Sequence, residues 1–145
     1  MRTVMMSNSG AHGLARTASR GLNIALWVLQ ALLAALFLWH GQFMAFPPAD
    51  MVAMINENIG PGLRVFIGVA EILAAAGLIL PGLTRILPFL TTLAAAGLMI
   101  VMSSASVFHL YRGETSSAIS AFLISLLITV VAYALLKGSK SEDSA

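Results

Sequence analysis

The residue that most directly suggests chemistry in this sequence is Glu71, which stands alone in an apolar run. The run extends from Arg64 to Pro81, is long enough to cross a bilayer, and has Glu71 about halfway along it. A carboxylate in hydrocarbon is costly unless it is protonated, paired or turned toward a cavity. Glu71 is therefore a candidate functional residue. The alternative is a structural carboxyl that bonds a serine, a glutamine or Arg64 and fixes helix register.

Two histidines are expected at a depth similar to that of Glu71. His109 falls near the end of the third apolar run and His40 near the end of the first, so an up-and-down bundle places both in the same half as Glu71. We expect Glu71 and His109 to be the catalytic pair that transfers protons. The alternative role of both histidines is anchoring at the membrane interface. The expected substrate-binding residues are His40, Gln42, Gln30, Ser103 and Ser106.

Metal or haem ligation by the same histidines is an alternative. His40 and His109 on neighbouring spans have the residue types of axial haem ligands, or could join Glu71 as a set of two histidines and one carboxylate. Nothing in the spacing requires such a set. No metal site is predicted, and a quinone is favoured over haem as the cofactor.

The composition is that of an integral membrane protein. Of 145 residues, 59% are hydrophobic and only 10% are charged, and the mean hydropathy is +0.91. The absence of cysteine excludes disulfides, thiol nucleophiles and iron–sulfur clusters. Basic residues are scattered singly, which argues against nucleic acid as a partner, and no glycine-rich phosphate-binding motif is present.

The predicted fold is an all-α, integral membrane four-helix bundle with a short interfacial segment between its first two helices. Prolines interrupt the apolar pattern at residues 47–48, 61 and 81, and Asp50 is the expected N-cap of the interfacial segment. We predict a tail over residues 1–20, a bundle over 21–136 and a second tail over 137–145. The four spans are expected at about 22–46, 62–80, 86–109 and 118–136.

Charge and small residues predict the orientation and one helix contact. With a cytoplasmic N-terminus, six basic residues lie inside and only Arg64 and Arg112 outside, so both termini are expected in the cytoplasm. The sequence LAAAGL occurs at residues 73–78 and again at 93–98. Because small residues let membrane helices approach closely, we expect the second and third spans to pack through these runs.

Four short stretches resemble the DoxX-like family of small four-span bacterial membrane proteins. They are PPADMV at 47–52, IGVAEIL at 67–73, GLILPGLTR at 77–85 and HLYRGE at 109–114. The resemblance implies a four-helix bundle in the cytoplasmic (inner) membrane and, from the founding members, a small subunit of a quinone-linked thiosulfate oxidoreductase. Many members carry a lysine about three residues after the glycine that closes the first span. Here Met44 follows Gly41 at that distance, so a lysine–carboxylate pairing is absent.

The predicted function is a membrane-embedded pocket for an apolar small molecule, favoured to be a quinone. Glu71 would exchange the proton, with His109 as its relay to water and His40 or Gln42 bonded to a substrate oxygen. A partner redox subunit would supply electrons, and lipid or a second copy of the chain are further expected partners. One alternative is a non-redox isomerase, cyclase or hydrolase acting on a terpenoid-like substrate. Another is a non-catalytic membrane subunit.

Overall fold

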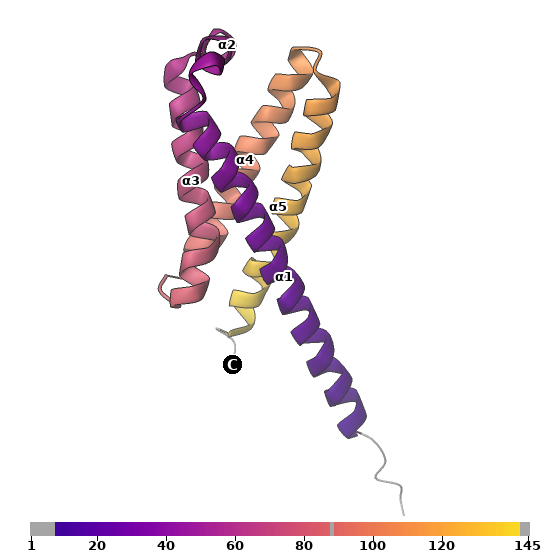
Figure 1. The fold of residues 1–145 in the computed structure, drawn as a ribbon. Helices are drawn as coiled ribbons and strands as arrows, with labels where there is room; N and C mark the ends of the chain where they lie inside the picture. Colours follow the sequence, from indigo (N-terminus) through magenta and orange to yellow (C-terminus); the bar gives the residue numbers. More distant parts are fainter. Residues whose placement is uncertain (1–7, 88, 143–145) are drawn as a thin grey trace, which may run out of the picture.

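The structure, a computed structural model, consists of five helices. It describes the backbone of residues 8–87 and 89–142, and the side chains of residues 20–87 and 89–137. The helices are α1 (Asn8–Ala45), α2 (Ala49–Ile59), α3 (Pro61–Thr84), α4 (Phe89–Tyr111) and α5 (Thr115–Glu142). No strand occurs among the described residues, and the predicted all-α fold is confirmed (Figure 1).

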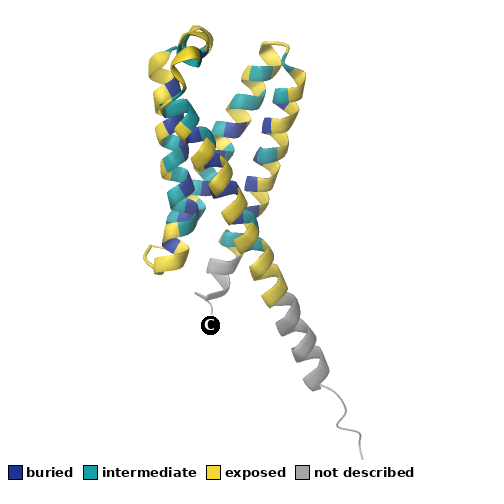
Figure 2. Cartoon of the chain, viewed as in Figure 1, coloured by how far each residue is buried: buried dark blue, intermediate teal, exposed yellow. Residues whose placement is uncertain are grey.

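Four of the helices have the length and hydropathy of membrane spans, as predicted. The apolar segments are Arg20–Ala45, Pro61–Thr84, Phe89–Tyr111 and Thr115–Lys137. The short α2 between the first two is the predicted interfacial segment. Large apolar side chains cover the outer faces of the spans, and buried residues follow their inner faces (Figure 2). This is the pattern expected where lipid is the surrounding solvent.

Several helix ends differ from the prediction, and α5 runs from Thr115 to Glu142, beyond both ends of the expected span at 118–136. Helix α1 begins at Asn8, within the stretch expected to be a tail. Helix α3 continues through Pro81 to Thr84, because a proline in the last turn of a helix removes only one backbone hydrogen bond. The expected N-cap of α2, Asp50, lies instead in its first turn, where its charge complements the helix dipole, and Pro48 occupies the N-cap position.

The helices form two closely packed pairs. Helix α1 packs along α3, and α4 packs along α5, while α3 and α4 join the pairs. Helix α1 approaches α5 only briefly, and the described backbones of α1 and α4 stay apart. The pairs diverge toward the end that carries α2 and the turn between α4 and α5 (Figure 1). We call this end of the bundle the α2 end.

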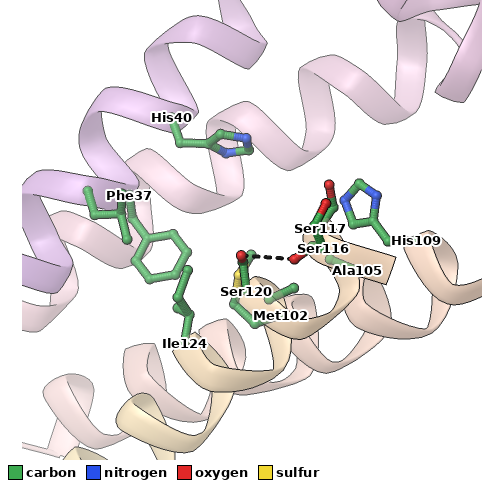
Figure 3. Close-up of a pocket in the computed structure, with 11 residues that line it drawn as sticks. Phe37, His40, Met102, Ala105, His109, Ser116, Ser117, Ser120 and Ile124 are labelled. Carbon is green, nitrogen blue, oxygen red and sulfur yellow. Dashed lines mark hydrogen bonds between the residues drawn. The ribbon is translucent and has the colours of Figure 1, made fainter. Parts of the chain in front are cut away.

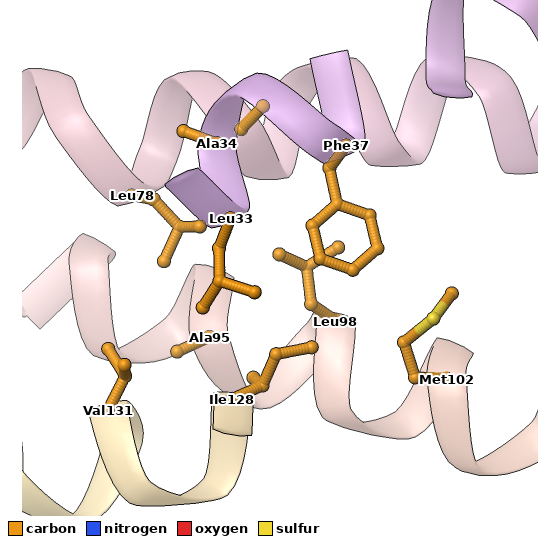
Figure 4. Close-up of a cluster of buried hydrophobic side chains, with 10 residues drawn as sticks. Leu33, Ala34, Phe37, Leu78, Ala95, Leu98, Met102, Ile128 and Val131 are labelled. Carbon is orange, nitrogen blue, oxygen red and sulfur yellow. The ribbon is translucent and has the colours of Figure 1, made fainter. Parts of the chain in front are cut away.

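The hydrophobic core lies where all four spans meet. Leu33, Leu78, Leu98, Ile128 and Val131 come from the four different spans and are almost fully buried (Figure 4). The two LAAAGL runs contribute to this core, and a Cβ built on Gly77 would lie 2.8 Å from the Cβ of Ala94. The predicted packing of these runs against each other is confirmed.

Two glycines bring α1 and α3 into backbone contact. A Cβ built on Gly41 would lie 2.8 Å from the carbonyl oxygen of Gly68, and one built on Gly68 would lie 2.5 Å from the backbone nitrogen of Ala45. Any larger residue at either position would push the helix axes apart, because the opposing atoms belong to backbone. The crossing therefore fixes the spacing of α1 and α3 next to Glu71.

A buried arginine closes the end of this pair. Arg64, only 8% exposed, donates hydrogen bonds to the carbonyl oxygens of Met44 and Ala45 and to the side chain of Asn56. The last carbonyls of α1 lack partners within their own helix, and a cation at that end is favoured by the helix dipole. Arg64 thus links α1, α2 and α3 at the α2 end.

We predict that Gly68→Ala lowers the free energy of unfolding by about 1–3 kcal/mol, because the added methyl group meets backbone that cannot move aside. Gly97→Ala on α4 is the matched control, since nothing lies within 4 Å of a Cβ at that position. Titration with sodium dodecyl sulfate in mixed micelles measures both. Equal stabilities of the two variants would contradict a backbone-limited crossing.

Candidate functional site

The centre of the candidate site is a hydrogen-bonded pair formed by Glu71 on α3 and His40 on α1. The Nδ1 atom of His40 lies 2.6 Å from Oε2 of Glu71. Glu71 is 0% exposed, whereas the side chain of His40 is 40% exposed. Residue 40 precedes Gly41, so the close crossing of α1 and α3 brings the imidazole within reach of the carboxyl group. The pairing reduces the cost of burying Glu71.

The carboxyl group is only half satisfied. Its second oxygen, Oε1, is buried and has no hydrogen-bond partner among the described residues. A buried polar atom without a partner costs about 1–3 kcal/mol. Arg64, considered from the sequence as a partner of Glu71, is engaged with Met44, Ala45 and Asn56 instead. Glu71 therefore depends on His40 alone for its hydrogen bonding to the described protein.

The pair controls what His40 presents on its other side. Because Nδ1 is held by the carboxyl group, Nε2 is the remaining polar atom of the ring. When Nδ1–H donates to the Glu71 carboxylate, Nε2 is an acceptor. When the pair holds a second proton, one proton lies in the hydrogen bond between Nδ1 and Oε2. The other is bound to Nε2, whether the first is closer to Nδ1 or to Oε2. One proton thus converts Nε2 from acceptor to donor.

His40 lines a pocket of about 360 Å³ between α1 and the α4–α5 pair. Its polar lining consists of His40, His109, Ser116, Ser117 and Ser120 (Figure 3). Its apolar lining consists of Leu36, Phe37, Met102, Ala105, Ala121 and Ile124. A mostly apolar cavity with a few converging polar groups is typical of small-molecule sites.

The second histidine of the pocket has its own carboxylate. Nδ1 of His109 lies 2.6 Å from Oε2 of Glu114, and Arg112 donates from Nε to Oε1 of the same carboxylate at 2.8 Å. Arg112 also donates from Nη2 to Oδ1 of Asn58 on α2, at 2.7 Å. Arg112 first, and then His109, hold the pKa of Glu114 below its ordinary value. These groups connect α2 to the turn between α4 and α5.

The structure brings only some of the predicted site residues together. His40, rather than His109, is the partner of Glu71, although both histidines line the pocket. Gln30 is buried and Gln42 is exposed, and neither lines the pocket.

The two predicted serines face the interface between α4 and α5. Ser103 bonds the hydroxyl group of Ser125 at 2.9 Å, and Ser106 donates to the carbonyl oxygen of Ala118 at 2.9 Å. Both serines therefore hold α4 to α5, and neither lines the pocket.

Sequence reasoning missed the serines at the start of α5. The predicted fourth span begins at residue 118, which places Ser116 and Ser117 in or beside a turn, and Ser120 falls inside that span without being named as a site residue. The signal that marks them is Glu114 followed by hydroxyl residues at helical spacing, which is typical of a helix N-terminus. Recognising that start would have placed them on the face that carries Ala121 and Ile124.

The described residues contain no group of three or more histidine, aspartate or glutamate side chains suited to a metal ion. His40, which bonds Glu71, and His109, which bonds Glu114, lie on different walls of the pocket (Figure 3). The two histidines thus each have a separate carboxylate partner instead of sharing one.

Comparison with known proteins yields one match. Residues 28–135, most of the 145-residue chain, match the model of the DoxX-like family. No curated protein and no solved structure matches the chain. The matched range includes all four apolar spans in large part, together with both imidazole–carboxylate pairs.

We predict that Glu114→Gln lowers the melting temperature at pH 7 and that the difference from the unchanged protein disappears in acid. The folded-state pKa of Glu114 lies below its ordinary value of 4.5, so its ion pairs stabilise the fold above that value. This contribution is lost as the pH falls through the lowered pKa. Thermal unfolding between pH 7 and pH 3 measures the difference.

The control for this experiment is Glu57→Gln. Glu57 is an exposed carboxylate on α2, and its side chain has no hydrogen bond to the described part of the chain. We expect its substitution to leave the melting temperature nearly unchanged throughout the pH range. A Glu114→Gln difference that did not shrink as the pH falls below 4.5 would contradict the ion-pair origin of the effect.

Proposed function

We propose that this multi-pass membrane protein, which belongs to the DoxX-like family, is a component of a quinone-linked oxidoreductase. In this proposal a quinone binds in the pocket between α1 and the α4–α5 pair. His40 bonds one quinone oxygen through Nε2, and the His40–Glu71 pair supplies or accepts its proton. His109, with Glu114, occupies the opposite wall and connects the pocket to water.

The observation that carries this proposal is the half-satisfied, fully buried carboxyl of Glu71 behind a half-exposed His40. A carboxyl that served packing alone would be better stabilised by several hydrogen bonds or by replacement with an apolar residue. Here its single partner is a titratable ring that faces a cavity. This arrangement supports a group whose protonation state is used at the pocket.

A quinone fits the chemistry that the pocket offers. Reduction of a quinone consumes two electrons and two protons, and each carbonyl oxygen becomes a hydroxyl group. An Nε2–H can donate to a carbonyl oxygen before the reaction and give up its proton as the negative charge develops there. The electrons must come from a partner redox subunit in this proposal, because the chain has no cysteine for an iron–sulfur cluster or a dithiol.

We further propose that the protein resides in a bacterial cytoplasmic membrane with both termini in the cytoplasm. This is supported by the six basic residues that lie on the side of the termini against two at the α2 end. The α2 end, and with it His109 and Glu114, would then face the non-cytoplasmic side.

A second candidate function is favoured by the presence of two imidazole–carboxylate pairs. His40–Glu71 and His109–Glu114 approach one pocket from different helices. One pair could remove a proton from a terpenoid-like substrate while the other delivers one, which is isomerase chemistry without electron transfer. Turnover by the isolated chain without any electron donor or acceptor would favour this function over the quinone-linked one.

We predict that His40→Asn weakens quinone binding about tenfold without unfolding the protein. The asparagine amide nitrogen can occupy the place of Nδ1 and keep the bond to Glu71. Asparagine has no atom in the position of Nε2, so the hydrogen bond to the quinone is lost. The loss of one hydrogen bond in a closed site corresponds to about 1.4 kcal/mol. Binding of decylubiquinone to the protein in lipid nanodiscs measures the change.

Two further variants sharpen this experiment. Glu71→Gln should retain most of the affinity but change the pH dependence of binding, because the amide cannot take up a proton and His40 is then the titratable group that remains of the pair. Ser104→Ala is the control, since Ser104 bonds only the carbonyl oxygen of Ile100 in its own helix and lies outside the pocket. Unchanged affinity in His40→Asn, or no saturable binding by the unchanged protein, would overturn the proposed function.

A further inference from the structure

The pocket has a polar end and an apolar end. On each of its three helices, a polar lining residue lies nearer the α2 end than an apolar one. On α5, Ser116 and Ser120 precede Ile124, and Ile124 lies about 12 Å deeper than Ser116 at 1.5 Å per residue. On α4, His109 lies nearer the α2 end than Met102. On α1, His40 lies nearer that end than Phe37. The polar groups therefore gather at the depth of one membrane interface.

On the side of the pocket between α1 and α5, the two helices make little contact. The two helices approach each other only briefly, near the core, and no hydrogen bond joins their described residues. Leu36 on α1 lines the pocket and is 39% exposed, and Ser116 and Ser120 on α5 are also exposed. Because both helices are membrane spans, this side faces lipid.

At the α2 end, a polar connection crosses between the two helix pairs. Arg112 of the α4–α5 turn donates to Asn58 of α2 and is held by Glu114, so the two divergent helix pairs are joined at the aqueous surface. A ligand that came from water would have to pass these groups. A ligand dissolved in the membrane can instead reach the pocket at the edge formed by α1 and α5, where Leu36, Ser116 and Ser120 are exposed.

We propose that the ligand of this pocket carries a single long apolar chain that leaves sideways into the lipid through the gap between α1 and α5. Its polar ring lies between His40 and His109, beside the serines of α5, and its chain follows Phe37, Met102 and Ile124 toward the middle of the membrane. This inference rests on the proposed function and deepens it. The substrate class is a long-chain membrane quinone, and a short water-soluble quinone lacks the chain contacts.

The volume of the pocket agrees with this arrangement. About 360 Å³ lies at the lower end of the range for small-molecule sites, enough for a substituted ring and the first part of a chain. A long isoprenoid chain cannot fit inside and must lie outside the protein. An opening to the lipid at the side removes the limit on chain length, whereas a pocket open only at the α2 end would exclude long chains.

The test compares three quinones and two tryptophan variants in nanodiscs. The quinones share a dimethoxy-methyl-benzoquinone ring and carry no chain, a decyl chain or ten isoprenoid units. Affinities are expressed as mole fractions of quinone in the lipid, so that differences in partitioning between water and membrane do not affect the comparison. We expect the two long-chain quinones to bind equally well and the chainless compound at least tenfold more weakly.

The variant Leu36→Trp adds bulk at the chain end of the pocket, and Leu32→Trp is its matched control. Leu32 lies one turn away on the same helix, is 63% exposed and does not line the pocket. Leu36→Trp should weaken the binding of both long-chain quinones about tenfold and leave the chainless compound unchanged. Leu32→Trp should affect none of the three. Thermal unfolding and size-exclusion profiles establish that both variants are folded.

The outcomes separate this inference from the proposed function. If the unchanged protein binds none of the quinones, the proposed function is overturned, and the inference with it. If the quinones bind but the longest chain is excluded, or Leu36→Trp weakens all three alike, the sideways exit of the chain is wrong while quinone binding stands.

Discussion

The hydrogen bond between His40 and Glu71 is the interaction on which the arrangement of this protein depends. A buried carboxyl group in a membrane span needs a partner, and the only one that the described protein provides is on another helix. That partner is within reach because Gly41 and Gly68 let the backbones of α1 and α3 touch. The chemistry of the site therefore depends on the glycine crossing of α1 and α3.

The same close contact explains why a pocket exists beside it. The part of α1 near the α2 end packs against α3, and Arg64 holds the last carbonyls of α1 there, so this part cannot also lie along α4. Protein interiors are normally close-packed, and the core filled by Phe37, Leu98 and Ile128 shows that these helices can achieve this. Nearer the α2 end the facing residues are small, such as Ala105, Ser117 and Ala121. The sequence thus places small residues where larger ones would fill the space, and a pocket is left between the helices.

The sequence was sufficient for the fold because hydropathy is a direct signal in membrane proteins. The four spans, the interfacial helix α2 and the contact between the LAAAGL runs all follow from apolar length, proline positions and small residues. The residues at which the helices begin and end were predicted less accurately than the helices themselves. Pro81 lies in the last turn of α3, where the loss of one backbone bond does not stop the helix, and the polar composition of residues 8–20 hid the extension of α1.

The partners of the site residues could not be derived in the same way. Helical spacing gives the face and depth of a side chain but not the rotation of one helix against another, so the depth of His40, Glu71 and His109 was predictable and their pairing was not. Ser103 and Ser106 illustrate the same limit, since membrane serines bond equally well to a neighbouring helix or to a ligand. The assignment of catalytic and binding residues stays a prediction.

The two imidazole–carboxylate pairs differ in how protons from water can reach them. Glu114 is exposed beside Arg112 at the α2 end, so protons can reach it from water without passing through the pocket. Glu71 is fully enclosed, and among the described residues the titratable group bonded to it is His40. A proton therefore reaches Glu71 through the His40 ring, whose free nitrogen is the one offered to the pocket. A ligand bound at Nε2 would cover this route, so the protonation of Glu71 and the occupancy of the pocket are coupled by geometry alone.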